Sequence, residues 1–599
     1  MKLNIYSIAA AAGLLLAVSC ESFLDETPVS KAGRDTYFTS ESALEIYSIG
    51  FLETQMPSAT TITRGDQYSD ICVVTQTEGF LKLGGYSAQQ ATNWAIANWR
   101  PLYRVNYFLK YMQEAAPYVD AATMQHYEGV GRFWRAWFYW DKVKTFGDVP
   151  YYDEPIDPDD DEALYKGRDS RDYVMGKVLE DLDYATTYCS TASKYVNTNV
   201  INRYVALALK SRICLYEGTW RKYHGLQDSE KWLRECVKAD EDLMANGPFK
   251  LVNTAGNETK NYSTLFKSEN LQYDEVILGN QFGSEWNRYH DASWFFSSGS
   301  AGNRNSMPKH FVNMYLNLDG SRFTDKAGYN RTEWKDEFVN RDYRLRQTVI
   351  TPYYSKKVSG VETDEFSRVF TGLDAQLTYY RIIKYNTDDD ANESNTSSWN
   401  SLPIFRYAGI LLDYAEAKAE LGEMTQTVWD RTIRPLRERS GVSGAAPADA
   451  DPYLAAYYEG VTDKWILECR RERSIELYLE NTRRDDLMRW RQGDLLTHEF
   501  AGIYIPELGK PFDMNGDGTN DICFYSKSHP KTGTQTGVTG VEITAEPGDN
   551  TTTFSINGDN CLVYVLDREW ADYKYLYPVP KTAIDINPNL LPQNQGWDD

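Results

Sequence analysis

The sequence predicts a mainly α fold, in which helical hairpins form a scaffold that carries long, irregular, loop-rich insertions. Apolar residues repeat at the helical period of 3.6 in several segments, of which residues 123–146 and 404–421 are clear examples. Small residues such as Ala206 and Ala415 stand where two helices can approach closely. Residues 251–403 are instead rich in Asn, Ser, Gly, Tyr and Trp. Because a structureless loop of that length is uncommon in a compact domain, we expect this insertion to pack on the scaffold.

The predicted helices fall into two groups. In the N-terminal helical scaffold, residues 37–250, the helix at 123–146 carries aromatic side chains nearly all round, which predicts that it is buried. Asn202 is expected to cap a later helix that ends just before Gly218. The pairing of helices resembles tetratricopeptide-type repeats, although insertions interrupt the spacing. Further helices are expected at residues 93–116, 172–188 and 228–245, and, within the C-terminal helical repeats (404–492), at 404–421, 428–440 and 465–491; an irregular C-terminal region with short β-like runs (493–599) should pack on the scaffold.

The amino terminus resembles a bacterial lipoprotein signal. Lys2 supplies a positive charge, and residues 8–18 form an apolar core that is too short to span a bilayer as a helix. Cys20 follows a small residue, as a lipid-accepting cysteine does. We therefore expect a signal peptide over residues 1–19, acylation of Cys20 and a lipid-anchored tether over residues 20–36. The alternative is an ordinary secretory peptide with a chance cysteine.

The composition limits the classes of partner. The formal net charge is −23, and such an acidic protein is a poor nucleic-acid binder, because phosphate contacts require clustered Lys and Arg. Residues 468–491 are rich in Arg, but Glu recurs every fourth residue in the first half of this run, which predicts an ion network that locks two helices. The seven cysteines beyond Cys20 are widely spaced and lack a C-x-x-C motif, so we expect mostly buried free thiols rather than disulfides or a zinc site.

Enzyme signatures are scarce. The chain has six histidines, and it lacks the sequence motifs of zinc proteases, P-loop proteins, serine hydrolases and dinucleotide-binding proteins. The paired carboxylates of a glycoside hydrolase cannot be recognised in a sequence, because the separation that matters is spatial. We therefore predict a protein that is not an enzyme, with a surface glycoside hydrolase as an alternative.

One segment matches the first nine positions of an EF-hand-like calcium loop. Oxygen ligands at positions 1, 3, 5 and 9, with glycine at position 6, suit a hard cation. The acid of position 12 is missing, since Phe524 stands there. No cofactor is required, but we expect that the loop can hold a structural calcium ion; the alternative is an Asx- and Gly-rich turn without an ion. The candidate ligands are Asp513, Asn515, Asp517, Thr519 and Asp521.

Several segments together resemble the SusD/RagB family of outer-membrane nutrient-binding lipoproteins. They occur in the family's order and span almost the whole chain after Cys20. Residues 478–483 depart slightly from the family's usual F-E-G-x-R motif. The shared motifs are FLDETP after Cys20, GRFWRAWFYWDKVKTFGDVPYY from Gly131, FRYAGILLDYAEAKAELG from Phe405, WDRTIRPLRERSGV from Trp429, RRERSIELYLENTRRDDLMRW from Arg470, and the terminal YPVP and NPNLLPQNQGW.

This resemblance implies a SusD-like scaffold of four helical repeats, anchored by lipid at the outer face of the outer membrane. It implies a surface-exposed protein that captures oligosaccharide and caps a SusC-like TonB-dependent transporter, to which it delivers the ligand. Because the family includes RagB-type proteins, peptide capture is an alternative function. A purely structural surface protein is a third alternative.

Two aromatic stretches with polar neighbours are candidates for binding a sugar ligand. Sugar rings present C–H patches that lie on Trp or Tyr faces, while sugar hydroxyls pair with polar side chains. One stretch covers residues 64–70, with Asn93 and Trp94 further on, and the other covers residues 286–296 inside the insertion. The alternative for each ring is local packing. The candidate ligand-binding residues are Asp66, Tyr68, Asn93, Trp94, Trp286, Arg288, Tyr289 and Trp294.

Overall fold

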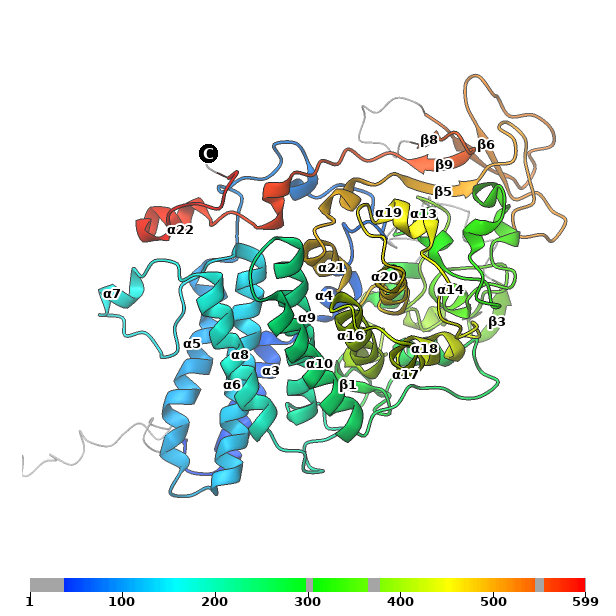
Figure 1. The fold of residues 1–599 in the computed structure, drawn as a ribbon. Coiled ribbons are helices and arrows are strands. Elements are labelled where there is room, and N and C mark those ends of the chain that lie inside the picture. Colours follow the sequence, from blue (N-terminus) through cyan, green and yellow to red (C-terminus); the bar gives the residue numbers. More distant parts are fainter. Residues whose placement is uncertain (1–36, 298–304, 365–376, 545–553, 598–599) are drawn as a thin grey trace, which may run out of the picture.

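The helices of the N-terminal part stand side by side as antiparallel hairpins, as the sequence predicts (Figure 1). The computed structural model describes residues 37–297, 305–364, 377–544 and 554–597, so the predicted signal peptide, Cys20 and the tether lie outside the described residues. The helices of this part are α3 (Glu41–Gln55), α4 (Ala59–Arg64), α5 (Ile96–Tyr111), α6 (Ala121–Phe146), α7 (Asp161–Leu164), α8 (Arg171–Tyr188), α9 (Arg203–Tyr223) and α10 (Ser229–Asn246).

The long aromatic helix α6 is buried, as predicted. The Oδ1 atom of Asp120 accepts hydrogen bonds from the N–H groups of Ala122 and Thr123 at 3.0 Å each, which caps the start of the helix. The helix ends at Gly147, whose φ of 73° suits a residue without a side chain. Helices α3, α5 and α8 pack against α6 and bury most of its aromatic side chains, while Trp137 is half-buried.

Helix α9 runs further than the sequence suggested. The predicted cap is present, because Asn202 Oδ1 accepts from the N–H groups of Tyr204 and Val205. Gly218, however, does not follow the end of the helix but lies inside it, and α9 continues to Tyr223. A Cβ atom on Gly218 would stand 2.8 Å from the side chain of Leu233 in α10, so this glycine serves the close approach of two helices.

The second helical group is more broken than predicted. The segment 404–421 begins as strand β4 before it turns into α16, and the predicted helices 428–440 and 465–491 are each divided in two. The second break contains Leu479 and Asn481, both at positive φ, which an α-helix does not accommodate. The elements of this group are β4 (Leu402–Arg406), α16 (Tyr407–Glu420), α17 (Gln426–Arg431), α18 (Ile433–Arg439), α19 (Pro452–Tyr457), α20 (Lys464–Glu476) and α21 (Arg483–Arg489).

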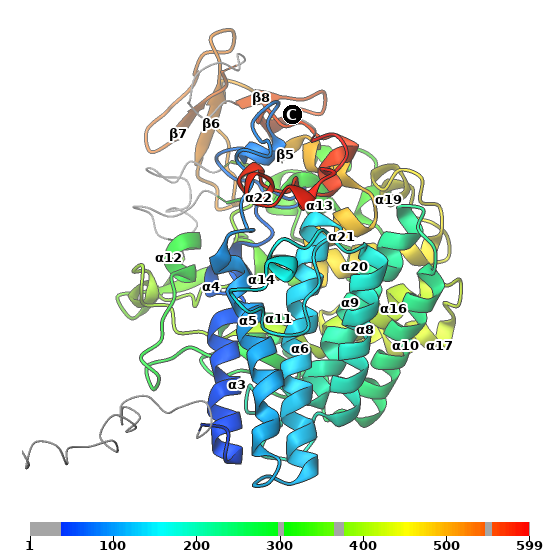
Figure 2. The same ribbon diagram turned by 90° about the vertical axis from the view of Figure 1, so that its left-hand side faces the viewer.

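The insertion and the C-terminal region contain short elements joined by long loops. Strand β1 pairs antiparallel with β4, β5 joins β9 and β8 in a small sheet, and β6 pairs parallel with β7. The strands β5 to β9 lie at one end of the molecule, above the helices (Figure 2). The elements are α11 (Asn261–Lys267), β1 (Val276–Asn280), α12 (Ala292–Ser297), α13 (Lys309–Met314), α14 (Tyr343–Thr348), β2 (Ser355–Val358), β3 (Val361–Asp364), β5 (Phe500–Tyr504), β6 (Ile522–Tyr525), β7 (Thr539–Glu542), β8 (Phe554–Ile556), β9 (Cys561–Tyr564) and α22 (Lys581–Ile586).

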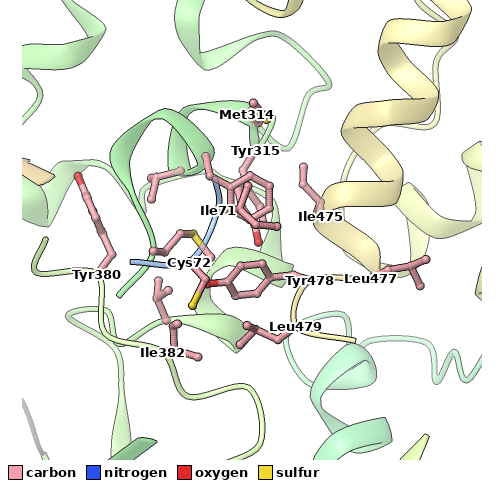
Figure 3. Packing of buried hydrophobic residues seen from close by; sticks show 14 of the residues in the cluster. Ile71, Cys72, Met314, Tyr315, Tyr380, Ile382, Ile475, Leu477, Tyr478 and Leu479 are labelled. Atoms are coloured by element: carbon pink, nitrogen blue, oxygen red, sulfur yellow. The ribbon is translucent and has the colours of Figure 1, made fainter. Parts of the chain in front are cut away.

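Two hydrophobic cores meet at the β1–β4 ribbon. The first core lies among the N-terminal helices and includes Leu278 of β1 and Phe405 of β4. The second core includes Leu402 of β4 and draws on the insertion, the helices around α20 and the C-terminal region; Figure 3 shows part of it around Cys72 and Tyr478. The insertion therefore packs on the scaffold, as expected. The seven cysteines beyond Cys20 are free and buried, which confirms the prediction made for most of them.

Candidate functional site

Three of the four predicted ligand residues that are exposed lie on a tight turn, the aromatic hairpin (residues 283–289). Gly283 N–H donates to Arg288 O at 2.9 Å, and Arg288 N–H donates back to Gly283 O at 3.2 Å. The chain reverses between them with Asn287 at a φ of 49°. A Cβ atom on Gly283 would stand 3.0 Å from the ring of Trp286, so the glycine lets this ring lie against the turn.

The aromatic hairpin presents two rings to solvent. Trp286 is 38% exposed and Tyr289 is 39% exposed. Among the described residues, Trp286 is the only tryptophan that is exposed to this degree. Arg288 and Asn287 are exposed beside them, and the Arg288 guanidinium lies 5.2 Å from the centre of the Phe282 ring. Flat apolar faces and hydrogen-bonding groups are thus available together on one turn.

The segment after the hairpin is anchored in the protein. His290 is buried and its Nε2 atom lies 2.8 Å from Asn400 O, while burial lowers the pKa of its imidazole to about 4. The following helix α12 carries Trp294, which is only half-buried and packs against the second core. The predicted aromatic stretch therefore divides into exposed rings before His290 and a partly covered ring after it.

The structure joins the two predicted aromatic stretches through Arg64. The Nη2 atom of Arg64 lies 2.5 Å from Asp291 Oδ2, and its guanidinium stacks 3.4 Å from the centre of the Phe295 ring. The end of α4 is thereby fixed against α12. These two stretches are separated by more than two hundred residues in the sequence, and nothing in the sequence indicated this pair.

Asp66 does not face solvent, contrary to what a ligand contact requires. It is fully buried, and its Oδ1 atom accepts a hydrogen bond of 2.9 Å from the N–H group of Arg483. Burial is the main reason that the pKa of this carboxyl is raised to about 7. Tyr68, two residues on, is half-buried at a φ of 63° and packs against the second core. The segment 64–70 therefore offers less to a ligand than its composition suggests.

Asn93 and Trp94 lie in front of α5, on the first core. Trp94 is half-buried, with its ring centre 5.4 Å from that of Trp99 and 4.8 Å from that of Phe146. Asn93 is exposed, and its carbonyl oxygen accepts a hydrogen bond of 2.6 Å from Lys142 Nζ. Among the described residues, the ring contacts of Trp94 are with its own core and not with the aromatic hairpin.

A cavity of about 500 Å³, which we call the central cavity, opens next to Asn93. Exposed lining residues such as Thr54 and Ala97 mark its mouth, and buried Arg473, Asp486 and Arg489 form its floor. Its size falls within the range of small-molecule pockets, roughly 300–1,000 Å³. Apart from Asn93, sequence reasoning missed this site, because its lining comes from many separate elements: α3, α4, α5, α6, α9, β4, α20 and the segment 480–489.

The segment predicted to bind calcium forms a turn that is closed by hydrogen bonds between its own residues. Asp513 accepts from the N–H groups of Gly516 and Gly518 at 2.6 and 2.8 Å, and Asp517 accepts from Thr519 N–H at 2.7 Å. Asn515 and Asp521 also accept backbone N–H bonds. In the part of the chain that the structure describes, no three His, Cys, Asp or Glu side chains converge as a metal site would require. Calcium binding here stays a prediction.

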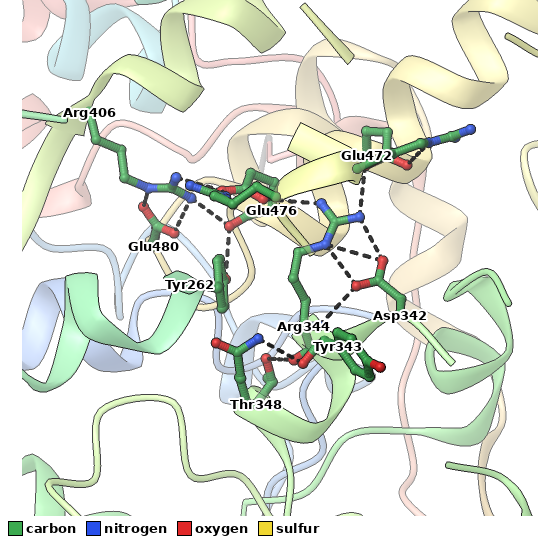
Figure 4. A network of polar contacts seen from close by, with 12 residues as sticks. Tyr262, Asp342, Tyr343, Arg344, Thr348, Arg406, Glu472, Glu476 and Glu480 are labelled. Carbon is green, nitrogen blue, oxygen red and sulfur yellow. Dashed lines mark hydrogen bonds and ion pairs between the residues drawn. The ribbon is translucent and has the colours of Figure 1, made fainter. Parts of the chain in front are cut away.

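The charged run 468–491 forms the ion network that the sequence predicts (Figure 4). Arg471 pairs with Glu468 at 2.7 Å, as expected from their spacing, but most partners come from distant elements. Glu476 contacts Arg344 at 3.0 Å and Arg406 at 2.6 Å. Although burial raises the pKa of the Glu476 carboxyl, the surrounding arginines more than reverse this and hold it well below its usual value. The run is therefore structural.

Comparisons with known proteins agree with the observed architecture. The family described as "SusD family" matches residues 274–597, and the family described as "Starch-binding associating with outer membrane" matches residues 22–215. The SusD-like protein P25 of Formosa agariphila is 23% identical over 506 residues, which cover 79% of this chain and 87% of that protein.

Solved structures share the fold. A SusD-like protein from Bacteroides fragilis aligns with a TM-score of 0.67 and 18% identity, over 95% of this chain and 100% of that chain. A SusD-like carbohydrate binding protein from the same species aligns with a TM-score of 0.67 and 20% identity, over 93% of this chain and 100% of that chain. The fold is therefore that of SusD-like helical scaffold proteins. With the family match over more than half of its length, the chain belongs to the SusD family.

The second matching family, over residues 22–215, is described as associating with the outer membrane. Among the described residues, no helix is both long enough and apolar enough to cross a membrane.

Proposed function

We propose that this protein is a cell-surface glycan-binding lipoprotein, which captures oligosaccharide and delivers it to a SusC-like TonB-dependent transporter. The observation that carries the proposal is the aromatic hairpin, where Trp286 and Tyr289 remain more than one-third exposed although the chain has two large cores to bury such rings. Family membership supports the proposal, because one matching family is described as starch-binding.

Sugar capture by the aromatic hairpin requires no conformational change of the protein. The faces of Trp286 and Tyr289 receive the C–H patches of sugar rings, and Arg288 and Asn287 donate hydrogen bonds to sugar hydroxyls. The turn is held by two backbone hydrogen bonds, and the segment after it is held by the Arg64–Asp291 ion pair. A prearranged surface loses little conformational freedom on binding, which favours affinity. No step of this function breaks a bond in the ligand, so the protein is not an enzyme in this proposal.

The test of ligand class is calorimetry of residues 21–599 against panels of glycans and peptides. We expect binding to at least one glycan, and a loss of about 1–3 kcal/mol of binding in Trp286→Ala, by analogy with aromatic–base stacking. Tyr118→Ala is the matched control, because Tyr118 is 67% exposed and lies outside the hairpin. Binding of peptides alone would contradict the proposal and favour a peptide-capturing relative.

The membrane anchor is a separate part of the proposal, since Cys20 lies outside the described residues. Two or more acyl chains are enough for stable anchoring, whereas one chain alone is marginal. We expect Cys20→Ser to abolish acyl labelling and to release the protein from the membrane fraction. A variant that remains membrane-bound and still takes up label would show that Cys20 is not the anchor. Co-purification of the wild-type chain with a TonB-dependent transporter tests the proposed partner.

A further inference from the structure

Basic side chains outnumber acidic ones in the lining of the central cavity by five to four. Its buried acids already have partners, since Asp486 pairs with Arg473 and Arg489 at 2.8 and 2.9 Å. Asp485 likewise pairs with Lys144 at 2.8 Å. Behind the lining, Asp413 and Glu416 also pair with Arg473 and Arg489.

Lys142 is the first cation of the cavity without an acidic partner. It is only 6% exposed, and its ammonium group has three N–H donors but bonds to a single acceptor, the carbonyl oxygen of Asn93. The Nζ atom lies 5.3 Å from the ring centre of Trp99 and 5.4 Å from that of Phe138, so aromatic faces rather than carboxylates surround it. Burial lowers the pKa of this ammonium group to about 8, although the charge of Asp141, which also lines the cavity, acts in the opposite direction.

Arg212 is the second such cation. Its Nη2 atom donates to Ile404 O at 3.1 Å, and its guanidinium lies 4.3 Å from the centre of the Phe405 ring. Burial lowers the pKa of this guanidinium, while the charges of Asp413, Glu480 and Asp485 act in the opposite direction. Among the described residues, neither Lys142 nor Arg212 forms an ion pair with a carboxylate. Lys142 is buried and Arg212 is half-buried. A buried charge without an ion pair is costly, and a bound anion would supply a partner.

We propose that the central cavity binds the acidic sugar unit of a glycan, with the carboxylate of a uronic acid paired to Lys142 and Arg212. The half-buried ring of Trp137 lines the cavity and offers an apolar face for the sugar ring. Asn93 and Asn98 at the mouth offer hydrogen bonds to hydroxyl groups. This inference rests on the proposed glycan-binding function, but it concerns a different site from the aromatic hairpin, so the two can fail separately.

The test compares glucuronate with glucose, which differ only at carbon 6, on the full chain purified in detergent. Binding is followed by tryptophan fluorescence, since Trp137 and Trp140 line the cavity, and by calorimetry. We expect glucuronate to bind at least tenfold more tightly than glucose. Lys142→Met and Arg212→Met should each weaken glucuronate binding at least tenfold, and Lys177→Met on the outer face of α8 should leave it unchanged.

The outcomes separate the inference from the proposed function. Equal affinity for glucose and glucuronate, or unchanged binding in both Lys142→Met and Arg212→Met, would overturn the acidic-sugar site, while glycan binding lost in Trp286→Ala would still support the proposed function. Preference for a dipeptide carboxylate over glucuronate would also overturn it. Melting temperatures of all variants are measured alongside; removal of an unpaired buried charge should not lower them, so lost binding with an intact fold counts for the site.

Discussion

Two aromatic-rich segments of this protein differ in what surrounds their rings. In α6, Phe133 and Trp134 are fully buried, because other helices enclose α6. In the aromatic hairpin, Trp286 and Tyr289 are more than one-third exposed, because the chain reverses within a few residues and only one side of the turn meets protein. Aromatic content therefore does not separate a core from a binding surface; enclosure of the backbone element does.

The largest effect is expected in α6. Trp134→Ala removes a ring that is 0% exposed and leaves a cavity, so the free energy of unfolding should fall by about 3–5 kcal/mol. Urea denaturation followed by circular dichroism measures the change. A loss below about 1 kcal/mol would mean that α6 is less enclosed than the structure shows.

Asp66 provides a pH-dependent test of a polar residue that was expected at the surface. Its folded-state pKa of about 7 exceeds its ordinary value of 3.8, so the folded state retains a proton that the unfolded state loses, and stability falls as pH rises from about 4 to 7. Asp66→Asn should remove this loss and gain at most about 4 kcal/mol above pH 7. Melting curves of both proteins at pH 5 and 8 should diverge at pH 8; parallel pH profiles would show that Asp66 is solvated.

Trp294 is intermediate in burial between the fully buried rings of α6 and the exposed rings of the aromatic hairpin. Because it is half-buried against the second core, Trp294→Ala should lower the free energy of unfolding by roughly 1–3 kcal/mol, less than a fully buried ring. If its melt is unchanged and glycan affinity falls instead, Trp294 belongs to the binding surface with Trp286.

For Trp286 itself, the expectation is reversed. Its removal should lower the free energy of unfolding by less than about 1 kcal/mol, since substitutions on the surface usually change stability little. Glycan affinity should fall while the melting temperature stays near that of wild type. A fall in melting temperature as large as that of Trp134→Ala would make the aromatic hairpin a part of the core.

The smallest effect is expected at the predicted calcium loop. The motif predicts that a chelator lowers the melting temperature, because an ion bound to the folded state adds stability, and that Asp517→Ala removes this sensitivity. The effect should be small, because the side chains of the loop already accept backbone hydrogen bonds. Identical melts with and without chelator would leave an Asx-rich turn without an ion.

The sequence predicted the helices well where the apolar periodicity was strong. It predicted them less well where one residue is compatible either with a helix end or with a close contact between helices. Gly218 was interpreted as a helix end, yet it stands inside α9 to admit Leu233. The break between α20 and α21 contains no Gly or Pro, so the sequence does not indicate it. The structure shows it through the positive φ of Leu479 and Asn481.

The candidate site was less predictable, because it depends on pairs that are distant in sequence. Composition located Trp286 and Tyr289, since nothing near them could bury a ring. It also pointed to Asp66, whose partner Arg483 lies 417 residues away and cannot be inferred from local pattern. The sequence places Lys142 as a charge on an aromatic helix, but only the structure shows that, among the described residues, it forms no ion pair with a carboxylate.

The packing of residues 564–597 on residues 73–88 has a consequence for how the chain folds (Figure 1). Tyr564 donates to Thr75 O at 2.8 Å across 489 positions, Glu569 N–H donates to Leu81 O, and the ring of Tyr577 stacks 4.2 Å from that of Phe80. Contacts of such long sequence separation are slow to form. The surroundings of Phe80 are therefore completed only after synthesis has reached these late residues, and a truncation before Tyr577 would remove a ring that packs on a residue some five hundred positions upstream.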